Sequence, residues 1–196
     1  MSTRKGLLLG FHGYQENAHV QMERLAAIPG AERWTLVSVQ GLHRFYRGRT
    51  NDVIASWMTR EDREAMIADN IAYVDAVVES VGDSSMPIVC AGFSQGVATA
   101  FRSAVRGHTG AAGVIAVGGD VPPELFADVT VRFPPVLLVR GARDEWYTQP
   151  KLEADVTALL ARHVSVQSLV IDGAHEWNAA VSDCAAAFLV SVVSTK

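Results

Sequence analysis

Residues 87–98 read PIVCAGFSQGVA, and this stretch decides the fold. Residues 87–91 form a short apolar run, rich in Val and Ile and without polar alternation, which is typical of a strand covered on both faces. Residues 95–106 are again mostly apolar, now with helical spacing. The stretch therefore predicts a buried strand, a tight turn that carries Ser94 between two glycines, and a helix that begins beside the serine.

The same alternation of apolar run and helical segment extends along the chain. Five further runs predict strands: 6–10, 34–39, 112–117, 135–140 and 166–171. Four further segments have helical spacing: 17–28, 61–81, 150–163 and 177–193. In 61–81 the apolar stripe consists of Ile67, Ile71, Val74, Val78 and Val81, at steps of three and four.

This order predicts one α/β domain over residues 1–196, with a mostly parallel sheet of about six or seven strands and helices on both faces. The least regular stretches are 40–60 and 118–134. Neither is long enough to predict a large lid. We find no internal repeat or linker.

Composition limits the function classes. The chain has 196 residues, 49% of them hydrophobic and 19% charged, with a net charge of -4 and no long run of one sign. A domain of this size supports a full core, and nothing favours nucleic acid as a partner. The N-terminal apolar run is too short for a signal peptide or a membrane span. With two cysteines, interpreted as buried free thiols, the expected location is the cytoplasm.

The serine has the surroundings that a nucleophile requires. A serine hydroxyl reacts only with a base to take its proton, an exposed position, and donors for the oxyanion that forms. A strand-to-helix turn exposes the hydroxyl, and Gly92 and Gly96 provide the small residues that such a tight turn needs. The alternative is an ordinary glycine-rich turn. The predicted strand before Ser94 and the helix after it favour the nucleophile.

A histidine and an aspartate also follow predicted strands. His175 comes after 168–171 and a short turn, and Asp144 comes after 136–140. Ligands of open parallel sheets bind at the carboxyl ends of the strands, so both positions suit a site. The order Ser94, Asp144, His175 is the order of the α/β-hydrolase triad.

These residues predict a catalytic set with separate roles. His175 takes the proton of Ser94 and returns it to the leaving group, and Asp144 orients the imidazole. Asp172 and Glu145 are alternative acids; Asp144 is preferred because Asp172 lies on the same turn as His175.

The oxyanion hole is predicted from backbone N–H groups. The loop after the first strand offers the N–H of Tyr14, with the N–H of Gln95 as its partner. His12 is interpreted as a structural residue that braces this loop.

Other side chains have weaker assignments. Aromatic residues near the candidate site are predicted to wall an acyl pocket, although a plain core role is as plausible: Phe93, Trp57, Trp146, Tyr147 and Trp177. The stretch 41–58 carries Arg44, Arg47 and Arg49, interpreted as a solvated basic loop in preference to a pocket rim for anionic or polar acyl groups.

No metal or organic cofactor is predicted. The stretch His175-Glu176-Trp177-Asn178-Ala179 starts like a zinc helix but lacks the second histidine four places on. No glycine-rich phosphate-binding fingerprint follows the first strand.

Four stretches together resemble one known family: FHGYQEN, CAGFSQGVATA, PPVLLVRGARDEWY and DGAHEWN. They are similar to the phospholipase/carboxylesterase family of small α/β-hydrolases, which includes carboxylesterases and acyl-protein thioesterases, from about Leu7 to Asn178. The resemblance implies ester or thioester cleavage without a cofactor, with Ser94, Asp144 and His175 as the triad. Family members often have a glycine where this chain has Gln15, which leaves the shape of the oxyanion loop open.

The sequence thus predicts a serine hydrolase that cleaves carboxylic esters of small to medium acyl substrates through an acyl-enzyme. A thioesterase or lactone hydrolase with the same triad, or a non-catalytic binding protein on this fold, are the alternatives. The expected partner is a small-molecule ester or thioester, with no nucleic acid and no stable membrane insertion, and the expected state is a monomer or homodimer.

Overall fold

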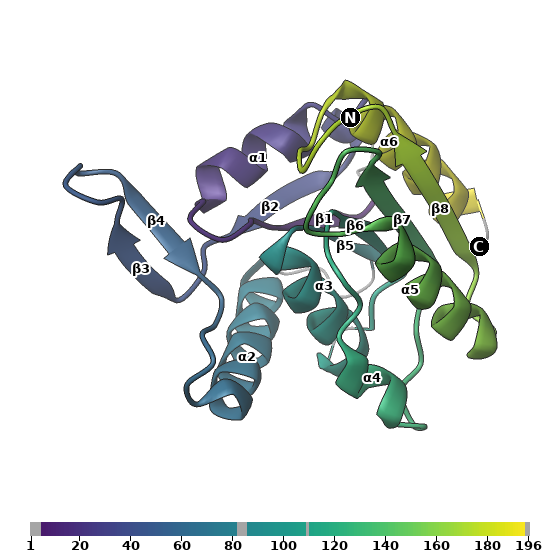
Figure 1. Cartoon of the computed structure of the whole chain (residues 1–196), viewed down its shortest axis with the longest axis horizontal. Coiled ribbons are helices and arrows are strands. Elements are labelled where there is room, and N and C mark those ends of the chain that lie inside the picture. The colour runs from purple at the N-terminus through teal and green to yellow at the C-terminus, as the bar shows by residue number, and fades with distance from the viewer. Residues whose placement is uncertain (1–4, 82–85, 109, 195–196) are drawn as a thin grey trace.

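The core of the computed structural model is a parallel sheet of six strands in the order β2-β1-β5-β6-β7-β8 (Figure 1). The structure describes residues 5–81, 86–108 and 110–194. Every neighbouring pair in the sheet is parallel. The six predicted runs form these strands: β1 (Leu7–Phe11), β2 (Thr35–Val39), β5 (Ile88–Phe93), β6 (Gly113–Val117), β7 (Val136–Gly141) and β8 (Val166–Ile171).

Helices cover both faces of the sheet, as predicted (Figure 1). On one face α1 (Ala18–Ala26) and α6 (Ala179–Ser194) contribute to a core that includes Leu8 of β1. Leu7 and Leu9 point to the opposite core, because successive side chains of a strand alternate between faces. The helices on that side are α2 (Arg63–Val81), α3 (Gln95–Arg106) and α5 (Gln149–Ala161).

Four elements lie where the sequence predicts no regular structure. Within 40–60, β3 (His43–Tyr46) and β4 (Val53–Ser56) form an antiparallel hairpin that projects from the main body (Figure 1). All four residues of β3 are exposed, so this strand has no apolar run that would predict it. The others are the 3-10 helix η1 (Ala31–Arg33), which falls between predicted elements, and the short helix α4 (Pro123–Ala127), which falls within 118–134.

The predicted stripe of α2 is mostly buried. Ile67, Val74 and Val78 are buried, whereas Val81 at the end of the helix is 38% exposed. Among the described residues, no helix is both long and apolar enough to cross a membrane. Cys90 is buried and Cys184 is half-buried, and both are free thiols.

Candidate active site

Ser94 lies at the junction of β5 and α3 in a strained conformation. Its φ of 51° and ψ of -119° fall outside the regions that L residues prefer, and such strain often marks a functional site. Its N–H donates to the carbonyl of Val117, at 2.9 Å. The turn requires both glycines: a Cβ on Gly92 would lie 2.6 Å from the carbonyl oxygen of Gly96, and one on Gly96 would lie 2.2 Å from that of Phe11.

The structure brings Ser94, His175 and Asp144 into one line of hydrogen bonds. His175 Nε2 lies 2.9 Å from Ser94 Oγ, and His175 Nδ1 lies 2.9 Å from Asp144 Oδ2. The Asp144 side chain is 1% exposed and that of His175 is 24% exposed. The carboxylate is therefore shielded from water, whereas the imidazole remains accessible beside the serine.

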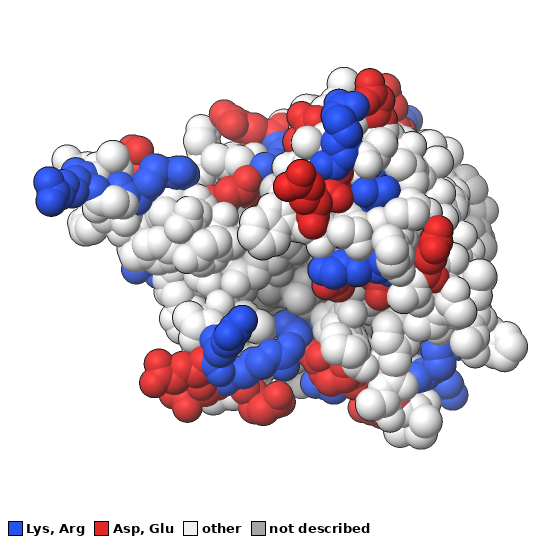
Figure 2. All heavy atoms as spheres, in the orientation of Figure 1, with Lys and Arg blue, Asp and Glu red and all other residues white. Residues whose placement is uncertain are grey.

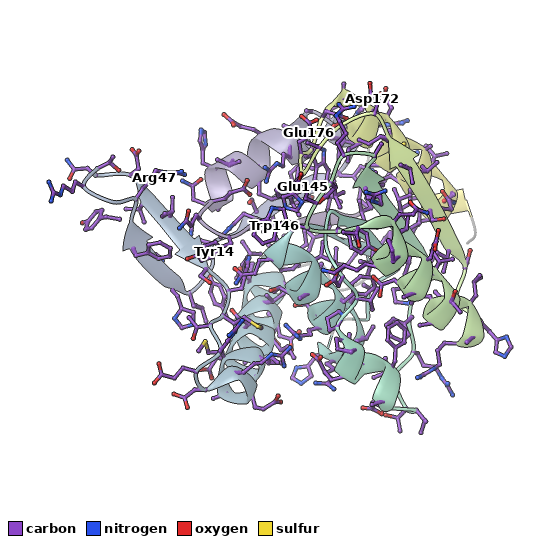
Figure 3. The ribbon with its side chains drawn as sticks, in the orientation of Figure 1. Tyr14, Arg47, Glu145, Trp146, Asp172 and Glu176 are labelled. Atoms are coloured by element: carbon purple, nitrogen blue, oxygen red, sulfur yellow. The ribbon has the colours of Figure 1, made fainter. Side chains whose placement is uncertain are left out.

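The alternative acids lie elsewhere. Asp172 is exposed and pairs with Arg143. Glu145 is exposed, and Figure 3 labels it between Glu176 and Trp146. Among the described residues, Asp144 alone has a carboxylate hydrogen-bonded to the His175 ring.

The loop that carries Asp144 is held by hydrogen bonds from its own backbone N–H groups to Asp144 and from Arg140 to its carbonyls. Asp144 Oδ1 accepts the N–H groups of Trp146 and Tyr147, each at 2.9 Å. The buried guanidinium of Arg140, at the end of β7, donates to the carbonyls of Tyr147 (2.8 Å) and Asp144 (3.2 Å). Sequence analysis missed the role of Arg140 in holding this loop, although a charged residue at the end of an apolar run can indicate a buried, hydrogen-bonded cation.

Both N–H groups predicted for the oxyanion hole are available. Among the described residues, neither the N–H of Tyr14 nor that of Gln95 has a hydrogen-bond partner. Gln15, at the position where the resembled family often has glycine, has a φ of 59°. This chain therefore adopts a left-handed conformation there with a side chain, which costs about 1 kcal/mol or more.

His12 braces the loop after β1 as a neutral imidazole. Burial lowers its pKa below the ordinary value. Its Nε2 accepts the N–H of Gly41 at 3.0 Å, so Nδ1 carries the proton and donates to the carbonyl of Gly13 at 2.7 Å. The indole N–H of Trp57 donates to the carbonyl of His12 at 2.8 Å.

A second set of contacts links this loop to the histidine. Glu16 Oε2 accepts the N–H of Gly13 at 2.8 Å, and Arg24 donates to both carboxylate oxygens of Glu16 at 2.6 Å. The Arg24 guanidinium lies 4.1 Å from the centroid of the Phe93 ring, which packs at 5.1 Å from the ring of His175. Sequence analysis missed Glu16 and Arg24, because no local pattern distinguishes them from surface charges.

The five aromatic residues predicted to wall a pocket lie in different environments. Trp57 and Tyr147 are 0% exposed, which corrects their assignment: they belong to the core and present no surface to a substrate. Phe93 is nearly buried and packs on His175. Trp177 lines a different surface hollow, beside Arg24.

Trp146 is the member of this set that lines the pocket next to the serine. The pocket has a volume of about 330 Å³. Trp146 is 75% exposed, and Figure 3 shows it near the middle of the view. Figure 2 shows this face hollowed, with charged residues of both signs around the hollow. The lining residues are Ser94, Gln95, Ala98, Gly118, Gly119, Asp120, Trp146 and Lys151.

The basic residues of 41–58 lie on the projecting hairpin (Figure 2). Arg44, Arg47 and Arg49 are all exposed, and none lines the pocket beside Ser94. Arg47 donates to the carbonyl of Gln15 at 3.0 Å, and Figure 3 shows it on the hairpin. No group of three or more His, Cys, Asp or Glu residues suited to a metal ion occurs in the part of the chain that the structure describes.

The fold is shared with several solved hydrolase structures. Esterase PE8 superposes with a TM-score of 0.76 at 21% identity, over 97% of this chain and 94% of that chain. The chain has the α/β-hydrolase fold. Other structures similar to this α/β-hydrolase fold are Zea mays acyl-protein thioesterase 2 (TM-score 0.74, 18% identity, 97% of this chain and 95% of that one) and the Bacillus cereus carboxylesterase (TM-score 0.74, 16% identity, 96% and 89%). No protein-family model and no curated protein matches the sequence.

Proposed function

We propose that the chain is a serine hydrolase that cleaves carboxylic esters of small to medium acyl groups through an acyl-enzyme. The observation that carries the proposal is the position of His175, whose two ring nitrogens lie 2.9 Å from Ser94 Oγ and 2.9 Å from Asp144 Oδ2. A nucleophile, a base and an orienting acid need these contacts.

The first half of the reaction forms the acyl-enzyme. With the proton of His175 on Nδ1 and donated to Asp144, Nε2 is free to accept the proton of Ser94 as Oγ attacks the carbonyl carbon. The N–H groups of Tyr14 and Gln95 donate to the oxyanion. The carbonyl re-forms as the bond to the leaving group breaks, and the leaving group takes the proton from Nε2.

The second half repeats these steps with water. His175 takes a proton from a water molecule, whose oxygen attacks the acyl carbonyl, and the proton then passes to Ser94 Oγ as the acid leaves. Asp144 stays ionised and stabilises the imidazolium in both halves.

Hydrolysis of p-nitrophenyl butyrate by the wild type and three variants tests the proposal. Ser94→Ala, His175→Ala and Asp144→Asn are each expected to lower kcat by about 10³-fold or more. Circular dichroism checks that each variant is folded. A folded wild type without hydrolysis would favour the binding-protein alternative. A fully active Ser94→Ala would show that Ser94 is not the nucleophile and would contradict the proposed mechanism.

Thioesters are the second candidate substrates. The same attack serves a thiol leaving group, and one similar structure is an acyl-protein thioesterase. Matched butyryl esters of p-nitrophenol and thiophenol, compared by kcat/KM, distinguish the two. A thioester preference well beyond the difference in chemical reactivity would replace the ester proposal by the thioesterase.

A further inference from the structure

We infer that the pocket beside Ser94 binds the acyl group and selects short acyl chains that carry a hydroxyl or another neutral group able both to donate and to accept hydrogen bonds. This inference rests on the proposed function. It concerns the pocket between the start of α3, the loop after β6, and the loop between β7 and α5.

The pocket lies on the acyl side of the reaction. Ser94 and Gln95, the proposed nucleophile and oxyanion donor, both line it, whereas His175 does not. The leaving group must receive its proton from His175 Nε2 and therefore departs on the side of the imidazole. The acyl group is left to occupy the pocket.

The lining does not suit a long hydrocarbon chain. Ala98, Gly118 and Gly119 provide small surfaces, and the largest side chain is the exposed indole of Trp146. As far as the described residues define it, the lining contains no Leu, Ile, Val, Met or Phe. The volume of about 330 Å³ is near the lower end for small-molecule sites.

The lining of the pocket includes an ion pair. Lys151 Nζ lies 3.1 Å from Asp120 Oδ2 and 2.9 Å from the carbonyl oxygen of Trp146. An ammonium has three N–H donors, so one remains for a substrate, and the second oxygen of Asp120 has no partner among the described residues. The pair is about half exposed, which leaves both groups accessible.

The opposite charges of the pair determine what it recognises. A substrate hydroxyl can accept from Lys151 while donating to Asp120. A carboxylate at this place would face the charge of Asp120, and an ammonium would face that of Lys151. The pair therefore favours a neutral polar group over an anion or a cation. It also favours such a group over a plain alkyl chain, which forms no hydrogen bond with either charge.

Buried contacts fix the two loops beside the pair: one carries Asp120, and the other carries Trp146, whose carbonyl accepts from Lys151 of α5. Asp155 of α5 accepts the N–H of Val121 at 3.1 Å and the hydroxyl of Tyr147 at 2.9 Å. Val121 follows Asp120, and Tyr147 follows Trp146. Because Asp155 is buried, its carboxylate holds both sides of the pocket in place before a substrate arrives.

Four methyl esters test the inference: methyl butanoate, methyl 3-hydroxybutanoate as both enantiomers, monomethyl succinate, and methyl 4-(trimethylammonio)butanoate. Their hydrolysis is followed by pH-stat. We expect kcat/KM of one hydroxy enantiomer to exceed that of methyl butanoate by about tenfold, the size of effect that one hydrogen bond to a charged group gives. Both charged esters are expected to be slower than the hydroxy ester.

Variants identify the source of the preference. Lys151→Met and Asp120→Asn should each reduce the ratio between the hydroxy ester and methyl butanoate to about twofold or less. Asp69→Asn, at an exposed aspartate of α2 outside the lining, is the matched control and should keep the ratio. Thermal unfolding checks that all three variants are folded.

The outcomes separate this inference from the proposed function. Hydrolysis of methyl butanoate without a hydroxy preference overturns the inference and leaves the proposed function standing. The same holds if the preference persists in Lys151→Met and Asp120→Asn, or if monomethyl succinate is the fastest substrate. Failure of all four esters overturns the inference, and it contradicts the proposed function as well only if p-nitrophenyl butyrate is also not hydrolysed.

Discussion

The side-chain amide of Gln95 accepts the backbone N–H of Trp57 at 3.0 Å, although the two residues are 38 positions apart. The same amide donates to the carbonyl of Met58 at 3.0 Å. Trp57 in turn donates to the carbonyl of His12. The side chain of Gln95 thus connects the start of α3 to the loop after β1, while its backbone N–H is a proposed oxyanion donor.

Gln95→Ala should lower both stability and rate. The N–H of Trp57 would lose its partner, and an unsatisfied buried group costs about 1–3 kcal/mol of the free energy of unfolding. Urea unfolding and kcat for p-nitrophenyl butyrate measure the two effects, with Gln167→Ala on the exposed edge strand as the control. We expect kcat to fall by about tenfold or more, because an oxyanion donor would be displaced. An unchanged kcat would contradict the positioning role.

His12 should make the free energy of unfolding sensitive to acid. Because burial lowers its pKa, the folded protein resists protonation at this ring, whereas the unfolded chain binds a proton near the ordinary pKa of 6.5. The free energy of unfolding therefore falls as the pH drops below 6.5, and well above 6.5 His12 contributes no pH dependence.

His12→Asn isolates this contribution, since asparagine keeps a donor for the carbonyl of Gly13 and does not titrate. Urea unfolding at about pH 7.5 and about pH 5.5 should show a smaller loss of stability for the variant than for the wild type. Equal losses would mean that His12 does not titrate differently in the folded and unfolded states.

Arg140→Met removes the buried cation that holds the loop of Asp144. The carbonyls of Asp144 and Tyr147 lose their donor, so we expect a loss of about 1–3 kcal/mol in the free energy of unfolding. If the loop positions Asp144, kcat falls while KM changes little. Arg143→Met, on the exposed side of the same loop, is the comparison. Loss of stability with an unchanged kcat would limit Arg140 to a structural role.

Cys90 should be inert in the folded protein. Burial raises the pKa of its thiol to about 12, which suppresses the reactive thiolate. Iodoacetamide labelling followed by peptide mass spectrometry should modify Cys90 only after denaturation and Cys184 first under native conditions. Rapid native labelling of Cys90 would contradict its burial.

The strands, and the positions of the candidate site residues just after them, could be predicted from the sequence because both follow from local sequence patterns. Apolar runs such as 87–91 indicate buried strands, and parallel strands place Ser94, Asp144 and His175 at the same edge of the sheet. The structure places their side chains within hydrogen-bonding distance of one another.

The remainder depends on contacts between distant segments. The sequence does not show whether the rings of Trp57 and Tyr147 face the candidate site or the core. In the structure both rings lie in the core. All four residues of β3 are exposed, so its sequence has no buried run that would reveal its pairing with β4. The link from Arg24 through Phe93 to His175 joins three elements, and only the folded chain shows it.

Fluorophosphonate labelling tests the central claim most directly, because the probe bonds covalently only to an activated serine. The account predicts stoichiometric modification of the wild type, located at Ser94 by peptide mass spectrometry, with no labelling of Ser94→Ala and strongly slowed labelling of His175→Ala. A folded wild type that takes no label, or a label that maps to another serine, would contradict it.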